Sequence, residues 1–194
     1  MIALLAAALL GASDPPPDPE PGSFLRLRMG AWAGRGFEFE ADRAGGVRVT
    51  SDGSTMASAG IDVGTELYRG VILFGTVEES AARNQRARAA GAYLGYRERP
   101  AESIGRGVPD EVTLYAGGLW GSFEVDESGF GDFDDAFGFG GGIELAWRLG
   151  RSSAISLLAE YRFLEFDYEP DVTGGDTKAG GSTGWLGIGI DLRF

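Results

Sequence analysis

The chain contains no cysteine and no histidine among its 194 residues. The absence of cysteine neither proves nor excludes an oxidising compartment. The absence of histidine is more informative, because it removes the commonest general base, the commonest metal ligand and most nucleophilic triads. We therefore expect no catalytic residue, no metal site and no cofactor, and we do not expect an enzyme.

Positive charge and long hydrophobic runs are also scarce. The chain has 17 Lys and Arg against 29 Asp and Glu, a formal net charge of −12, so it offers no cationic surface for nucleic acid. Beyond the N-terminus no run approaches the roughly 18 apolar residues that a membrane-spanning helix needs. This does not exclude a transmembrane β-barrel, in which only every second residue faces lipid.

The first residues differ from the rest of the chain. Residues 1–13 are rich in Ala and Leu and end in small residues, which predicts a secretory signal peptide, although the basic segment that usually opens such a signal is absent. Residues 14–23 form an acidic, Pro-rich linker that cannot be a helix or an interior strand. Residues 24–194 are then long enough for one domain of about eight spanning strands.

The last ten residues show the clearest pattern. From Leu186 to Phe194 every second residue is Leu, Ile or Phe, and the residues between them are Gly, Asp or Arg. Because side chains of a strand point alternately to its two faces, this segment is apolar on one face and polar or small on the other. The same alternation indicates strands at residues 24–32, 58–68, 70–78, 89–97, 112–121, 137–149 and 154–164.

The connections between these segments alternate in length. Residues 68–70 and 149–152 are tight turns, whereas 33–57, 79–88, 123–136 and 166–182 are long. Outer-membrane barrels have short periplasmic turns and long external loops, so this pattern favours an up-and-down meander with a periplasmic N-terminus. The stretch 98–111 is an irregular turn because it holds Pro100 and Pro109. Residues 78–90 have an alternative interpretation as a helical turn.

These features resemble the small eight-stranded outer-membrane β-barrels of the OmpA, OmpX and opacity-protein kind. The expected fold is therefore all-β: an eight-stranded antiparallel up-and-down transmembrane β-barrel. The resemblance implies a monomer in the outer membrane of a Gram-negative-type bacterium, in contact with lipid and lipopolysaccharide. It also implies insertion by the barrel-assembly machinery, for which Phe194, Leu192 and Ile190 of the closing strand would be the signal. Tryptophans and tyrosines near strand ends, such as Trp32, Trp120 and Trp147, would form interfacial girdles.

The inward-facing set of the eight segments contains many charged residues. An eight-stranded barrel is only wide enough for side chains to fill it, and buried charges are tolerated when they are paired. We therefore predict an interior ion-pair network. Its members are Arg26, Arg28, Asp62, Glu66, Arg97, Glu144, Arg148, Glu160, Arg162, Asp191 and Arg193.

The long loops hold most of the acidic residues, with six carboxylates in 124–135 and five in 165–180. Such residues could bind divalent ions, but solvated surface loops are the simpler interpretation. Arginines at 83, 86 and 88 could contact lipopolysaccharide. The sequence thus predicts a non-enzymatic outer-membrane protein with a structural or surface-interaction role. The alternatives are a transport protein or narrow pore for small solutes or apolar molecules, and a soluble ligand-binding barrel.

Overall fold

A computed structural model describes most of the chain after the first 21 residues. The described ranges are 22–33, 38–43, 47–51, 55–82, 85–100, 107–125, 132–167 and 178–194. The predicted signal peptide, most of the Pro-rich linker and the central residues of both acidic loops lie outside these ranges. Within them, no helix is long and apolar enough to cross a bilayer.

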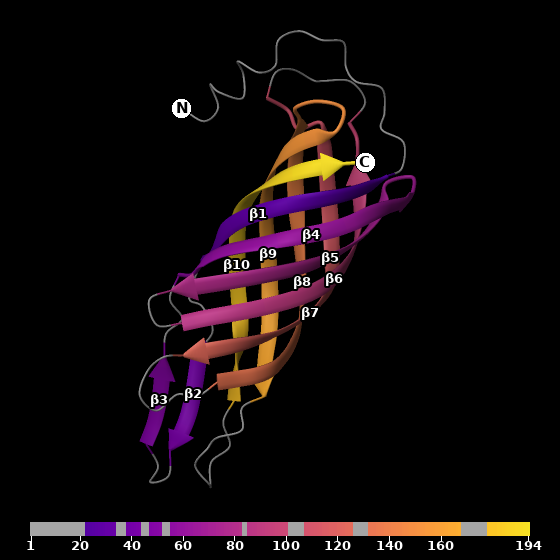
Figure 1. Cartoon of the computed structure of the whole chain (residues 1–194). Helices are drawn as coiled ribbons and strands as arrows, with labels where there is room; N and C mark the ends of the chain where they lie inside the picture. Colours follow the sequence, from indigo (N-terminus) through magenta and orange to yellow (C-terminus); the bar gives the residue numbers. More distant parts are fainter. Residues whose placement is uncertain are drawn as a thin grey trace.

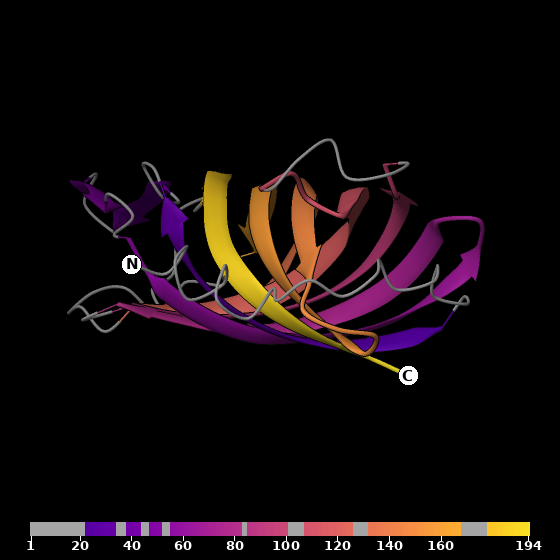
Figure 2. The same cartoon turned by 90° about the horizontal axis from the view of Figure 1, so that it is seen from above.

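Eight long strands form the wall of a barrel (Figures 1 and 2). Each strand pairs with its neighbours in antiparallel fashion, and the pairing of the first strand with the last closes the cylinder. The observed fold is therefore the closed eight-stranded antiparallel barrel that the alternation predicted. The strands are β1 (Ser23–Ala33), β4 (Ala57–Tyr68), β5 (Val71–Ala82), β6 (Gln85–Glu98), β7 (Glu111–Val125), β8 (Asp132–Arg148), β9 (Ser153–Asp167) and β10 (Lys178–Arg193).

The two ends of the barrel differ. At the end we call the terminal end, the backbones of Ser23 and Phe194 bond to each other, with N···O distances of 3.0 and 3.1 Å. The tight turns at 69–70 and 149–152 lie at this end, and the first of them places Arg69 and Gly70 at positive φ. The opposite end, which we call the loop end, holds the β5–β6, β7–β8 and β9–β10 connections.

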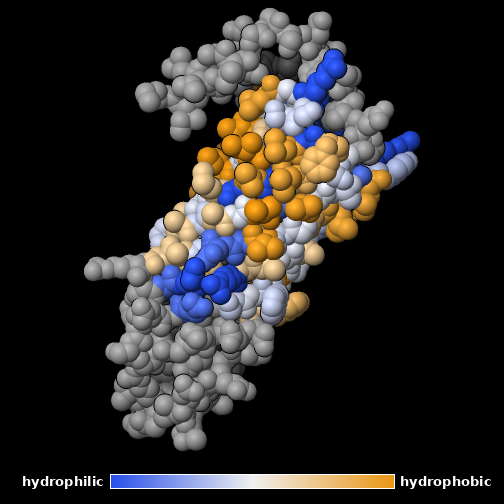
Figure 3. All heavy atoms as spheres, viewed as in Figure 1, coloured by the Kyte–Doolittle hydropathy of each residue, from blue (hydrophilic) through white to orange (hydrophobic). Residues whose placement is uncertain are grey.

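The outer and inner faces of the wall separate apolar from polar side chains as predicted. Large apolar residues of all eight strands are exposed on the outside, because no other element in the described part of the chain covers them. They form a belt, shown in orange across the upper and middle part of the face in Figure 3, with blue polar residues nearer the loop end. Members of the belt include Leu27, Met29, Ile61, Val63, Leu73, Val77, Leu94, Leu114, Trp120, Phe137, Phe139, Leu157, Tyr161, Leu186, Ile188 and Ile190.

Several strands extend further toward the loop end than the sequence indicated. The predicted long loop at 79–88 is wrong: β5 continues to Ala82 and β6 begins at Gln85, and these two residues pair directly. The alternative of a helical turn over 78–90 is wrong for the same reason. Strands β7, β8, β9 and β10 likewise occupy much of the predicted loops at 123–136 and 166–182.

The predicted loop at 33–57 contains a small additional hairpin. Its strands are β2 (Glu38–Arg43) and β3 (Val47–Ser51), and β2 pairs with the first residues of β10. The hairpin therefore prolongs the wall at the loop end, as the lower left of Figure 1 shows. It adds no ninth strand to the barrel, because the closing pair is β1 with β10.

One of the aromatic residues expected at the membrane interface points the other way. Trp32 is only 3% exposed and lies inside the barrel, where its indole N–H donates to Glu78 over 3.0 Å. Alternation along β1 places Trp32 on the same face as Arg26 and Arg28, so the strand period overrides the general preference of tryptophan for interfaces. Trp120 does face outward, with 57% of its surface exposed.

Candidate functional site

The interior of the barrel is where charged residues converge. All eleven residues named as inward-facing from the sequence lie on the inner side of the wall, and most are almost fully buried. Three further charged residues lie among them: Glu78, Arg99 and Glu111. In the described residues, seven arginines thus meet seven carboxylates inside the barrel.

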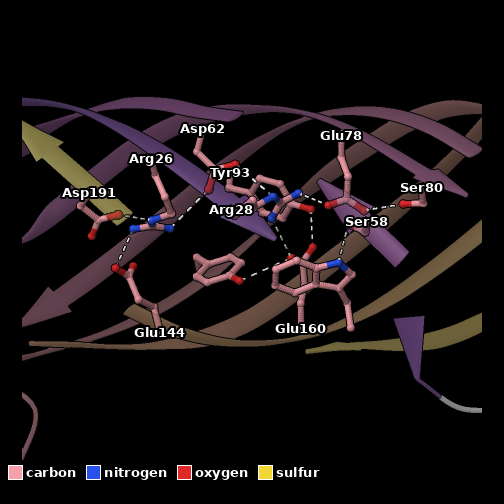
Figure 4. Close-up of polar contacts among 12 residues, drawn as sticks. Arg26, Arg28, Ser58, Asp62, Glu78, Ser80, Tyr93, Glu144, Glu160 and Asp191 are labelled. Atoms are coloured by element: carbon pink, nitrogen blue, oxygen red, sulfur yellow. Dashed lines mark hydrogen bonds and ion pairs between the residues drawn. The ribbon is translucent and has the colours of Figure 1, made fainter. Parts of the chain in front are cut away.

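These side chains form two groups, of which the larger occupies the middle of the barrel. We call it the central network; Figure 4 shows most of its members reaching toward one another from different strands. It consists of Arg26, Arg28, Asp62, Glu78, Glu144, Glu160, Arg162 and Asp191. Six of the eight strands, β1, β4, β5, β8, β9 and β10, contribute these residues, each at an inward position of the alternation, so the network follows from the pleat.

Arg26 is the branch point of one half of the central network. Its guanidinium nitrogens lie 2.5 Å from Asp191, 2.6 Å from Glu144 and 3.3 Å from Asp62. Those carboxylates belong to β10, β8 and β4, so one side chain of β1 is bonded to three other strands. Arginine suits this position because its guanidinium has five donors in a fixed plane and stays charged.

Arg28 and Arg162 form the other half of the central network, around the carboxylates of Glu78 and Glu160. Arg28 lies 2.6 Å from Glu78 and 3.4 Å from Glu160. Arg162 contacts the same pair, at 2.8 Å and 2.9 Å respectively. Glu160 also accepts a hydrogen bond from the hydroxyl of Tyr93 over 2.6 Å. Charge-assisted hydrogen bonds of this kind are the strong ones in a low-dielectric interior.

Aromatic rings surround the charges of the central network. The guanidinium of Arg162 lies 5.4 Å from the ring centre of Trp32 and 5.6 Å from that of Trp185. Trp185 is fully buried and donates its indole N–H to Ser58 over 2.9 Å. Phe74 stacks on Tyr93 with ring centres 5.0 Å apart. The rings exclude water from the ion pairs and add cation–π attraction.

The second group, which we call the terminal cluster, lies toward the terminal end and centres on Glu111. This carboxylate lies 2.7 Å from Arg193, 2.8 Å from Arg148 and 3.4 Å from Arg97. The cluster also includes Arg99, which pairs with Glu66. Phe24 lies between the two groups, because the guanidinium of Arg26 is 5.4 Å and that of Arg97 is 5.3 Å from its ring centre.

Glu78 and Glu111 are central to these contacts, and the sequence pattern did contain a signal for both. Glu78 is the last residue of the segment 70–78 and continues the inward set of Ile72, Phe74 and Thr76. Glu111 lies one residue before the segment 112–121, in phase with Thr113. Glu78 therefore already lies within a predicted strand, and beginning the segment 112–121 one residue earlier would have included Glu111.

Known structures can be compared with this geometry. No family model and no curated protein matches the chain. The crystal structure of Neisserial surface protein A matches with a TM-score of 0.57 and 14% identity, covering 89% of this chain and 99% of that one. The chain has the fold of the small eight-stranded outer-membrane β-barrels.

Two further structures support the same fold. The N-terminal β-barrel domain of Pseudomonas aeruginosa OprF has a TM-score of 0.57 at 11% identity and covers 90% of this chain and all of that domain. The outer membrane protein AlkL, determined in DMPC lipid bilayers, has a TM-score of 0.53 at 15% identity and covers 95% of each chain. At these identities the likeness concerns the fold, and the resemblance stated from the sequence is thereby confirmed.

Proposed function

We propose that this barrel resides in the outer membrane as a non-enzymatic protein with a structural or surface-interaction role, its lumen closed by ion pairs and its loop end facing the outside of the cell. The observation that carries the proposal is that the outer and inner faces of the wall bear different kinds of side chain. Large apolar residues cover its outside and paired charges fill its inside, the reverse of a soluble ligand-binding barrel.

The outer belt supports residence in a bilayer. A soluble monomer rarely exposes a continuous apolar patch larger than a few hundred Å². Here exposed Leu, Ile, Val, Phe and Trp side chains surround the barrel on all eight strands. A closed barrel is also one of the two backbone arrangements that satisfy every hydrogen bond in a hydrocarbon environment.

The filled lumen supports a structural role over a conducting one. Arg26, Arg28 and Arg162 bridge carboxylates of opposite walls, and aromatic rings occupy the space beside them. An ion that entered would have to displace a guanidinium from a carboxylate in a low-dielectric interior. Separating such a buried pair costs about 3–5 kcal/mol, which opposes conduction through the middle of the barrel.

The long strands support a role at the surface. A tilted strand needs about 9–11 residues to cross the membrane, whereas β7 to β10 have 15 to 17. At the loop end of the adjoining strands β5 and β6, the outward side chains of Glu79, Arg86 and Arg88 replace the apolar belt. The wall therefore continues beyond the belt as a rigid platform for the external connections.

Planar-bilayer recordings on the purified chain test this proposal. We expect no stable channel conductance in the wild type, together with a change in gel migration on boiling that marks a folded barrel. Reproducible conductance from a folded, heat-modifiable sample would favour the narrow-pore alternative. An epitope placed in the β7–β8 connection should be accessible to antibody on intact cells, and accessibility only after the outer membrane is broken would contradict the orientation.

A further inference from the structure

An apolar groove of about 900 Å³ crosses the outside of the barrel where the belt ends toward the loop end. Its volume is within the range of about 300–1,000 Å³ that is usual for small-molecule sites. The register sets Leu27, Ile61, Val77, Ala90 and Trp120 side by side across five consecutive strands of the wall, and all five line the groove.

The hollow has a simple cause in the sequence. Ala90 stands between the large side chains of Val77 and Trp120, and the next outward residue toward the barrel centre on β6 is Ala92. Ala92 in turn pairs with Gly75 and Gly118, which have no side chain at all. Large residues therefore border a strip of small ones, and the strip leads from the polar edge into the apolar belt.

An arginine without a partner among the described residues lies at the polar edge of this groove. Arg88 is exposed and lines the groove. It is directly opposite Glu79 in the register of β5 and β6, yet Glu79 forms its ion pair with Arg86 instead. Arg88 consequently has no hydrogen-bond or ion-pair partner among the residues that the structure describes, and its donors are available to a ligand.

We propose that this groove binds a phosphorylated lipid of the surrounding membrane leaflet, with the phosphate on Arg88 and an acyl chain along Ala90 between Val77 and Trp120. The inference depends on the membrane residence proposed above. A guanidinium is suited to phosphate because its planar donors match the oxygens in pairs. An indole beside it favours the level of the headgroups, where one edge meets lipid and the other meets water.

Lipid titration followed by native mass spectrometry tests the site on the full chain in detergent. The probes are phosphatidic acid and phosphatidylcholine with identical acyl chains. We expect phosphatidic acid to bind more tightly, and Arg88→Ala to weaken it about fivefold, the equivalent of about 1 kcal/mol for one arginine at a charged membrane surface. Ala90→Phe should weaken binding without changing any charge, because the ring would occupy the groove.

Matched variants distinguish binding at this site from non-specific attraction of the lipid to other exposed arginines or to other parts of the belt. Arg151→Ala removes one exposed arginine from the opposite end, and Ala116→Phe enlarges an outward residue on β7 that does not line the groove; both should bind phosphatidic acid as the wild type does. Equal losses of binding in Arg88→Ala and Arg151→Ala, no preference for phosphatidic acid, or unchanged binding in Ala90→Phe would each overturn the proposal. Heat-modifiable migration in phosphatidylcholine vesicles is the separate test of membrane residence, since it is independent of the groove.

Discussion

Arg162 of β9 and Glu78 of β5 join opposite walls of the barrel through two parallel hydrogen bonds, of 2.8 and 3.0 Å. Three strands separate β5 from β9 in either direction around the cylinder. No backbone hydrogen bond can connect walls that lie this far apart. The ion pair therefore supplies a link across the lumen that the sheet itself cannot provide.

Removing the charge of Glu78 should destabilise the barrel strongly. Glu78→Gln removes one of the two buried carboxylates that Arg162 contacts, which leaves Glu160 to balance it, and it also removes the 2.6 Å ion pair of Arg28. Breaking a buried pair in this way costs about 3–5 kcal/mol. The free energy of unfolding, measured by denaturant titration of the protein in detergent with tryptophan fluorescence, should fall by that amount.

The adjacent residue provides the control for this change. Glu79→Gln removes a carboxylate that pairs with Arg86 on the outer surface, where both side chains are half exposed. An exposed pair contributes about 0–1 kcal/mol, so this variant should unfold close to the wild type. Equal destabilisation by the two substitutions would contradict a buried network in the lumen.

Two neighbouring glycines should respond differently to a methyl group. Gly117 faces inward, and a Cβ there would overlap the backbone of Ala92 and Tyr93 on the adjoining strand. Gly118 faces outward, and a Cβ there would meet nothing within 4 Å. Gly117→Ala should therefore cost about 1–3 kcal/mol, the usual range for overpacking, whereas Gly118→Ala should be neutral.

Folding yields and denaturant midpoints of the two alanine variants measure this difference. Because the two positions are adjacent on β7 and receive the same methyl group, changes in strand propensity are matched between them. A Gly118 variant as unstable as the Gly117 variant would show that the inner and outer faces of β7 are assigned incorrectly.

Tryptophan quenching should distinguish the two faces in a bilayer. Trp120 is 57% exposed on the belt, whereas Trp185 is fully buried in the lumen. In vesicles of brominated phosphatidylcholine, a variant that retains only Trp120 should be quenched strongly relative to ordinary lipid. A variant that retains only Trp185 should be quenched little, and comparable quenching of both would contradict a lipid-facing belt.

The closing strand allows a test of assembly apart from stability. We propose that Phe194, with Leu192 and Ile190, is the signal read by the barrel-assembly machinery. Phe194 is 77% exposed, so its ring adds little to packing, and its backbone bonds to Ser23 do not need the side chain. Phe194→Ala should refold normally in detergent yet reach the outer membrane of cells at a reduced level.

Leu186→Ala serves as the comparison, because Leu186 is also exposed on β10 but lies outside the proposed signal. Its level in the outer membrane should match that of the wild type. If the Phe194 variant accumulates normally in the membrane, the C-terminal residue has no role as an assembly signal.

Alternation of side chains predicted the barrel strands where one face of the wall meets lipid. Leu186, Ile188 and Ile190 mark such a strand because their neighbours Gly187 and Gly189 face the lumen. Beyond the belt the outer face meets water, so Glu79 and Arg88 are outward and the apolar alternation disappears. The strand pairs between Glu78 and Ala90 were therefore mistaken for a loop, although their backbone pairing is regular.

The sequence by itself determined which face of each strand is apolar, because the period of two is a local property of the backbone. It also determined that arginines and carboxylates share the interior. Only the tertiary structure decided that Arg162 meets Glu78 and that Glu111 collects Arg97, Arg148 and Arg193. Those pairings depend on the register and tilt of strands around a closed cylinder, which bring together side chains from opposite walls that no local pattern relates.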